Sequence, residues 1–308
     1  MMLVAITTGL SAAGFTVAPA ATSFTNVTSH RGNSFSYSCG IYTGMSSGEV
    51  YPNAPLALVA AEIRYPPVSE RSLGMPVHRQ IRDLLGDDWV IHNGTAQTLE
   101  AELGPAGPQA SLKSETVGRI TSRSRTKIIT VRPENLTVEV SDYIHFADFR
   151  DLLQRAAAAV EQVIKPDGVA RAGLRYIDEV TVPEGTPDWP KWLHASLFPP
   201  ALPPTLVPTS WTGAVQYQVE DDQVVVFRYG PSDGPVVSPQ GPLRRTRVPQ
   251  GPVFMLDFDS SWQPHDIPRF SADNIVEVAD RLREPLRGLF DSLIRPDLLR
   301  LFRQEPKT

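Results

Sequence analysis

Two carboxylates in the second half of the chain are spaced so that they could act together in chemistry. Asp257 and Asp259 alternate within an apolar stretch at 253–259 that is typical of a β-strand, so both should project from one face. Paired carboxylates can bind a divalent cation or divide acid and base roles between them. The alternative is a solvated strand face, with Leu256 and Phe258 packing inward. No third ligand lies nearby at a sensible spacing, so we predict no metal here and keep both aspartates as candidate binding residues.

The densest polar cluster on a predicted strand consists of Arg175, Tyr176, Asp178 and Glu179. Arg64 stands at the corresponding place in an earlier strand, so Arg64 and Arg175 could clamp a carboxylate or phosphate through bidentate hydrogen bonds. The structural alternative is a pair of ion pairs, one between Arg64 and Glu62 and one between Arg175 and Asp178 or Glu179. We take Arg64, Arg175, Tyr176 and Asp178 as candidate binding residues.

Two basic stretches could contact an anionic partner. The proline- and glycine-rich stretch at 230–252 carries Arg244, Arg245 and Arg247, and a stretch this long without regular structure is either mobile or functional. These three arginines are therefore also candidate binding residues. The second run contains Arg119, Arg123, Arg125, Lys127 and Arg132. It is interpreted as an anion- or nucleic-acid-binding face or as an edge strand protected by charge, and nucleic acid is not favoured because interleaved aromatic residues are missing.

Several common signatures of enzymes and cofactor sites are absent from the sequence. It contains no Walker A motif, no G-x-G-x-x-G, and no H-x-x-x-H or H-E-x-x-H spacing among its histidines. We therefore predict no catalytic residue, no metal and no cofactor. The single cysteine, Cys39, cannot form a disulfide within the chain, so nothing requires an oxidising compartment.

The elements that must position these residues are predicted from hydrophobic periodicity. The apolar residues of the helix at 146–164 form one stripe, and Pro285 within the last long helix predicts a kink or a break into two helices. In chain order the predicted elements are a strand at 54–65, a helix at 75–85, several short strands between 89 and 140, a helix at 146–164, a strand at 169–182, a short helix at 187–198, a hairpin of 211–219 with 223–229, a strand at 253–259 and a helix at 271–294.

Each half of this series has the order β-α-β(several)-α. Ile63-Arg64-Tyr65 in the first strand of one half also matches Leu174-Arg175-Tyr176 in the first strand of the other. We expect an α+β fold with two similar halves, residues 51–168 and 169–308, produced by internal duplication. By fold-level analogy each half has a curved antiparallel sheet packed on a long helix, as in helix-grip or TATA-binding-protein-like folds. Residues 1–50 have no charged residue before Arg31 and are expected to be a disordered or non-native extension.

Four motifs resemble a sporadically distributed, functionally uncharacterised family of bacterial and archaeal proteins. They are Y-P-N-A-P-L at 51–56, E-I-R-Y at 62–65, G-L-R-Y-I-D at 173–178 and L-D-F-D at 256–259. The resemblance covers about residues 51–304 and implies no catalytic assignment. It implies accessory genes, such as those of phage defence or toxin–antitoxin systems. Asp178 departs from the family pattern, where Asn is more frequent, so a hydrogen-bond donor at this position is not implied.

The 308 residues carry a net charge of −5, which argues against a protein that coats nucleic acid through bulk charge. We expect a cytoplasmic binding protein whose partner is another protein, contacted through a sheet groove or through 230–252. Residues 3–21 are too weakly apolar to span a membrane. The oligomeric state is not indicated.

Two other functions remain open at this point. One is an enzyme acting on a phosphorylated or nucleic-acid substrate, which requires Asp257, Asp259, Arg64 and Arg175 to share one concave pocket. The other is a small-ligand sensor that uses the cavity which helix-grip sheets can leave under their long helix.

Overall fold

A computed structural model of the chain describes residues 6–10, 51–69, 73–104, 107–183, 187–200, 208 and 210–304. For 6–10, 93–104 and 107–117 it describes the backbone alone. Apart from 6–10, the first fifty residues lie outside these ranges, so the extension predicted there stays a prediction.

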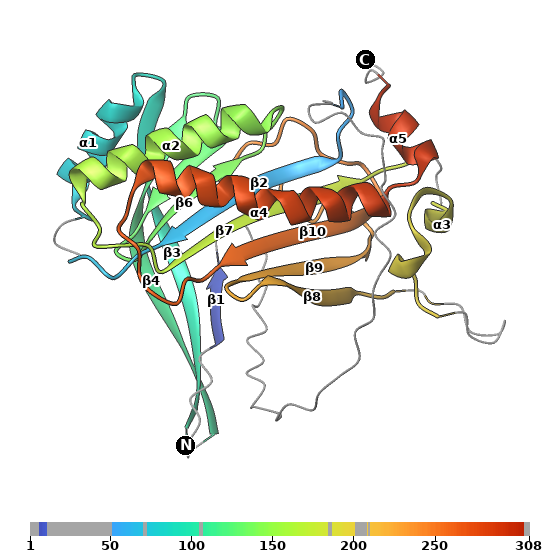
Figure 1. The fold of residues 1–308 in the computed structure, drawn as a ribbon, viewed down its shortest axis with the longest axis horizontal. Helices are drawn as coiled ribbons and strands as arrows, with labels where there is room; N and C mark the ends of the chain where they lie inside the picture. The colour runs from blue at the N-terminus through green and yellow to red at the C-terminus, as the bar shows by residue number, and fades with distance from the viewer. Residues whose placement is uncertain are drawn as a thin grey trace.

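The described strands form one antiparallel sheet with the order β1-β3-β4-β5-β6-β2-β7-β10-β9-β8 (Figure 1). Nine of them come from residues 56–262, and β1 adds a tenth at the edge beside β3. The strands are β1 (Ile6–Leu10), β2 (Leu56–Arg64), β3 (Trp89–Gly104), β4 (Gly107–Ser122), β5 (Lys127–Val131), β6 (Asn135–Val140), β7 (Arg171–Val180), β8 (Gly213–Glu220), β9 (Gln223–Ser232) and β10 (Val253–Trp262).

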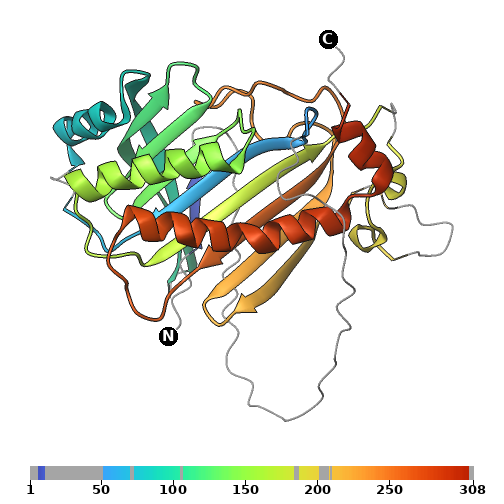
Figure 2. The same cartoon turned by 45° about the horizontal axis from the view of Figure 1, so that its top comes forward.

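Two long helices cover one face of this sheet and lie side by side (Figures 1 and 2). They run antiparallel, since Arg150 near the start of α2 pairs with Asp280 of α4, and Glu161 near its end accepts a hydrogen bond from the Ala272 amide. The helices are α1 (Met75–Leu85), α2 (Phe146–Val163), α3 (Trp189–Trp192), α4 (Ala272–Leu293) and α5 (Pro296–Phe302), with a 3₁₀ turn at Ala195–Leu197.

The core lies between the two helices and the central strands, because side-chain alternation sorts each strand into two faces. Val59 and Ile63 of β2 are buried toward the helices, as are Leu153 of α2 and Leu282 of α4. One continuous apolar cluster results, which confirms the α+β class with an antiparallel sheet packed on long helices. The sheet is continuous across the predicted boundary at 168/169, because β2 pairs with β7 from Leu56 to Arg64.

The structure corrects three local predictions. The predicted break into two helices at Pro285 is wrong: the helix at 272–293 is continuous, because buried Leu282 and Leu286 on either side hold both halves against the sheet. The β3 and β4 strands are 16 residues each and form one long hairpin, in place of several short strands. The basic run from Arg119 to Arg132 is not a charged edge strand, since β4 and β5 both lie inside the sheet.

In the part of the chain that the structure describes, no helix combines the length and the apolar character needed to cross a membrane.

Candidate functional site

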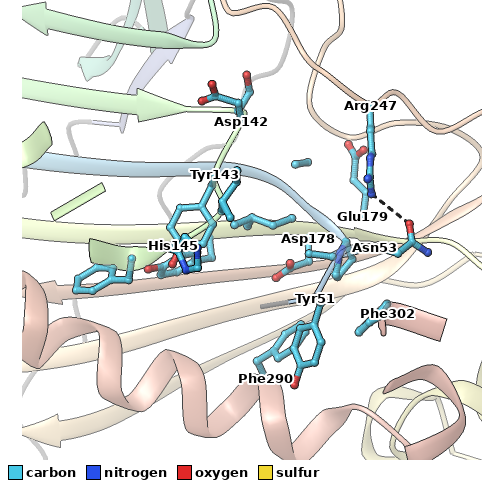
Figure 3. Close-up of a pocket in the computed structure, with 18 of the residues that line it drawn as sticks. Tyr51, Asn53, Asp142, Tyr143, His145, Asp178, Glu179, Arg247, Phe290 and Phe302 are labelled. Carbon is cyan, nitrogen blue, oxygen red and sulfur yellow. Dashed lines mark hydrogen bonds between the residues drawn. The ribbon is translucent and has the colours of Figure 1, made fainter. Parts of the chain in front are cut away.

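A cavity of about 1020 Å³ opens on the helix-covered face of the sheet (Figure 3). It exists because α2 starts at Phe146, beside Arg283 of α4, so the ten residues of α4 from 284 to 293 have no α2 alongside. At about 1.5 Å per residue, this leaves roughly 15 Å of α4 without its helical neighbour. The other walls are the segment 51–57, the loop 141–145 and the loop 245–249. The volume is at the upper end of the range for small-molecule sites.

Asp178 lies in the interior of this cavity and points into the space between Tyr143 and Tyr51 (Figure 3). A bulge in β2, where the register with β7 shifts between Leu56 and Leu58, adjoins it. Its side chain is 5% exposed, and within the described residues it forms no hydrogen bond or ion pair. Burial, and then the negative charges of Asp257 and Glu179, raise its pKa to about 8. At neutral pH Asp178 is therefore mostly protonated and can donate a hydrogen bond, which the sequence pattern alone did not imply.

Two tyrosines and an arginine stand next to Asp178. The rings of Tyr143 and Tyr176 meet edge to face, with centroids 5.9 Å apart, and the Arg283 guanidinium lies 4.6 Å from the ring centroid of Phe146. Burial raises the pKa of both tyrosines above 10, and Arg283 opposes this rise. The Tyr176 hydroxyl is buried and makes no hydrogen bond of regular geometry to the protein. The Tyr143 hydroxyl and the Arg283 guanidinium interact with it, so these three side chains form one polar cluster on the cavity wall.

The opposite end of the cavity is aromatic. Tyr51 and Phe302 have ring centroids 6.1 Å apart, and Phe290 stacks on Phe302 at 6.3 Å. Phe290 also meets Phe258 of the sheet edge to face, which connects this cluster to the core. The site thus has a polar end at Asp178 and an apolar, ring-lined end at Tyr51 (Figure 3).

The predicted loop at 230–252 closes one side of the cavity and is held by its own arginines. Arg245 forms a buried ion pair with Glu179, at 2.6 Å, and the same carboxylate accepts hydrogen bonds from the backbone amides of Val236 and Val237, both at 2.7 Å. The Arg244 side chain donates to the Ser124 carbonyl. Side chains therefore bind this long segment to the sheet, although it has little regular structure.

Arg247 fixes the same loop to the N-terminal wall. It donates hydrogen bonds to the Asn53 side chain, at 3.2 Å, and to the Pro52 carbonyl, at 3.0 Å (Figure 3). The Y-P-N-A-P-L motif and the loop arginines thus form one rim.

The remaining candidate residues on strands, Arg64, Arg175, Asp257 and Asp259, lie on the other face of the sheet. Arg175 grips Asp257 with two hydrogen bonds, at 2.7 and 2.8 Å, and Arg228 adds a third contact at 3.3 Å. The predicted pairing of Arg175 with Asp178 or Glu179 is wrong, because alternation turns Asp178 to the helix side while Asp257 of the adjacent strand lies diagonally opposite Arg175. Asp257 is also not on a solvated face, since it is 2% exposed.

Asp259 and Arg64 do not complete a pocket with these two residues. Asp259 lies directly opposite Arg175 on the same face. Burial raises the pKa of Asp259 above its usual value, although the neighbouring arginines offset part of this rise. Arg64 ends β2 with a 56% exposed side chain and pairs with Glu62, the predicted structural partner. None of these four residues lines the cavity of Figure 3, so the geometric condition for the enzyme hypothesis is not met there.

Four of the nine candidate binding residues predicted from the sequence line the cavity: Tyr176, Asp178, Arg245 and Arg247. Tyr143, Arg283 and Phe290, which also line the cavity, were not predicted. A signal for Arg283 existed in the sequence. This charged residue lies at helical spacing from buried Ala279 and Leu286, so it belongs to the inner side of α4. Tyr51 was quoted only as part of a motif.

No family model matches the chain, and no curated protein is detectably similar to it in sequence. Among the described residues, no group of three or more His, Cys, Asp or Glu side chains is arranged to hold a metal ion.

Proposed function

We propose that this protein binds a small organic molecule in the cavity between α4, the loop 245–249 and the segment 51–57. The observation that carries the proposal is the unpaired, 5% exposed Asp178 in a cavity of about 1020 Å³. Buried polar groups normally have hydrogen-bond partners, and an unpartnered one in a large concave pocket is typical of a ligand site.

The two competing functions have less support. For the enzyme, Arg175 and Asp257 neutralise each other on the opposite face of the sheet. For a protein partner contacted through the loop 230–252, all three loop arginines already have partners within the chain. Both remain hypotheses, as does the role in defence or toxin–antitoxin systems that the family resemblance implies.

The proposal is tested by thermal unfolding against a panel of nucleotides, aromatic carboxylates, neutral aromatics and amines. A ligand present at a hundred times its Kd stabilises the folded state by about 2.7 kcal/mol, which corresponds to a rise in Tm of roughly 4–5 °C for a chain of this size. Native mass spectrometry of the protein purified from cells gives a second readout, a retained small molecule.

A matched pair of tryptophan variants locates the binding. Ala147 lines the cavity from the first turn of α2 and is exposed, so Ala147→Trp should block the site. Ala158 is exposed on the same helix but does not line the cavity, so Ala158→Trp is the control. Stabilisation that survives Ala147→Trp, or no stabilisation by any class of compound, would contradict the proposal.

We also propose that the two halves arose by internal duplication. The matching tripeptides at 63–65 and 174–176 support this, together with the central antiparallel pairing of β2 and β7. Superposing β2-β6-β5-α2 on β7-β10-β9-α4 tests the idea, which requires Arg64 to fall on Arg175.

A further inference from the structure

Two arginines of the described cavity wall, Arg247 and Arg283, have no carboxylate partner, and Arg247 is engaged by the Asn53 side chain and the Pro52 carbonyl. Arg150, Arg245 and Arg287 of the same wall are paired with acidic side chains. Arg283 contacts the Phe146 ring, and no ion pair is formed by it within the described part of the chain. A guanidinium is always charged at accessible pH, so an unpaired one in a partly enclosed site favours an anion.

The groups around Arg283 are all hydrogen-bond donors at neutral pH. The Tyr143 and Tyr176 hydroxyls keep their protons because burial raises their pKa values, and the Tyr176 hydroxyl makes no hydrogen bond of regular geometry to the protein. Asp178 is largely protonated below pH 8 and lacks a partner. Donors that converge on one space without an acceptor are matched by a group with several acceptor oxygens.

The carboxylates of the wall do not offer a site for a cation. Glu179 is saturated by Arg245 and two backbone amides. One oxygen of Asp142 accepts a hydrogen bond from Thr126 and the other is buried without a partner, and Asp142 lies apart from Tyr51 and Phe290 in the view of Figure 3. Asp291 is paired with Arg287. An amine held between Tyr143 and Tyr51 would therefore depend on Asp178, which is mostly neutral at pH 7.

The ring-lined end of the cavity defines the rest of the ligand. Tyr51, Phe290 and Phe302 form a cluster with centroid separations of 6.1 and 6.3 Å. Such a wall binds flat unsaturated rings through stacked and edge-to-face contacts.

We propose that the ligand of this cavity is an organic anion with a flat ring, whose carboxylate, sulfonate or phosphate group binds at Arg283, Tyr143, Tyr176 and Asp178 and whose ring packs against Tyr51, Phe290 and Phe302. This inference rests on the proposed ligand-binding function and adds its chemical class. The cavity has room for a ligand of nucleotide size, which is a member of this class.

Binding of such an anion depends on the protonation of Asp178, because the ionised carboxylate would repel it. With a pKa of about 8, the protonated fraction falls about tenfold between pH 7 and pH 9, and the apparent affinity falls with it. Ionisable groups of the cavity wall surround Asp178: Tyr176 and Glu179 of β7, Asp142, Tyr143 and His145 before α2, Arg150 of α2, Arg283, Arg287 and Asp291 of α4, Arg245 and Arg247 of the loop, and Tyr51. Asp257 of β10 acts on it from the other face of the sheet. A His145→Gln variant separates the histidine from Asp178, and its profile between pH 7 and pH 9 should equal that of the wild type.

The test uses two fluorescent probes of nearly the same shape, anionic 8-anilinonaphthalene-1-sulfonate and neutral N-phenyl-1-naphthylamine. Neither changes charge between pH 7 and pH 9, so a pH effect on binding comes from the protein. Only fluorescence that Ala147→Trp abolishes is counted, which removes binding to apolar surfaces elsewhere. We expect the anionic probe to bind at least about tenfold more tightly than the neutral one at pH 7, the effect of one charge-assisted hydrogen bond.

Two substitutions assign this preference to residues. Arg283→Gln should remove the preference for the anionic probe, whereas Arg281→Gln should keep it, because Arg281 of the same helix stacks on Trp262 outside the cavity. Asp178→Asn should bring the ratio of the Kd values at pH 9 and pH 7 close to one.

The outcomes separate this inference from the proposed function. Equal binding of the two probes, or identical behaviour of Arg283→Gln and Arg281→Gln, would overturn the anion assignment while leaving a ligand site. If neither probe gives fluorescence that Ala147→Trp removes, both this inference and the cavity as a ligand site fail.

Discussion

Replacing Asp178 by asparagine should stabilise the folded protein, and the gain should increase with pH. The folded state holds the proton of this buried carboxyl up to about pH 8, whereas an unperturbed aspartate releases it near pH 3.8. The folded state therefore binds more protons than the unfolded chain between these values, so stability falls as pH rises through them. The slope is about 1.4 kcal/mol per pH unit.

The expected magnitude follows from this slope. From pH 5 to pH 8 the wild type loses about 4 kcal/mol relative to a variant that has no titrating proton at this position. This is a large part of the roughly 5–15 kcal/mol that stabilises an ordinary protein. Above pH 8 both states have lost the proton, so the difference between variant and wild type should level off.

The assay is urea unfolding at intervals from pH 5 to pH 9, followed by tryptophan fluorescence, because urea leaves the ionic strength unchanged. Asp151→Asn makes the same change of charge at a side chain of α2 that is 71% exposed, and it serves as the control. If the stability difference between Asp178→Asn and the wild type is constant from pH 5 to pH 8, the carboxyl is not held protonated and the reasoning is refuted.

Three other substitutions test the framework of the cavity, each by urea unfolding. Glu179→Gln leaves the charge of buried Arg245 without its partner and should lower the free energy of unfolding by about 3–5 kcal/mol. Hydrogen exchange in the loop 236–247 should become faster, and unchanged exchange would contradict the anchoring role of Glu179. Gly213→Ala places a methyl group inside the van der Waals contact distance of the Tyr229 ring and should destabilise the β8–β9 hairpin by about 1–3 kcal/mol, a loss that Tyr229→Ala should partly relieve. Pro285→Ala restores a backbone donor inside α4 and should stabilise the protein by about 1 kcal/mol or more, and a loss of stability would show that the proline is required there.

Much of the local structure could be predicted because it depends on short-range patterns. The helix predicted at 75–85 has these bounds in the structure, since Pro76 begins it and Gly86 ends it. The strand containing Asp257 was likewise found from its alternation, and both aspartates do share one face. Pro285 misled the prediction because the packing of α4 on the sheet outweighs the loss of one helical hydrogen bond.

The site could be predicted only in part because it is assembled from segments far apart in the chain. Tyr51, Tyr143, Asp178 and Arg283 come from four segments, and their meeting depends on where α2 begins relative to α4. The ion-pair partners were mispredicted for a related reason. Cross-strand register decides them, and register is not visible in the spacing along one strand.

Three buried carboxyls near one end of the sheet show why Asp178 points to a ligand. Glu179 is satisfied by Arg245 and two amides, and Asp257 by Arg175 and Arg228. The described residues therefore provide partners for the other two buried acids in this region and provide none for Asp178, at a cost of several kcal/mol at neutral pH. An unpaired group of this cost, inside a cavity whose wall also holds the Tyr176 hydroxyl and the Oδ1 atom of Asp142 without hydrogen bonds of regular geometry, is explained when its partner is a bound ligand. Because Asp178 is protonated at neutral pH, that partner must offer an acceptor, which is the property the two probes are chosen to measure.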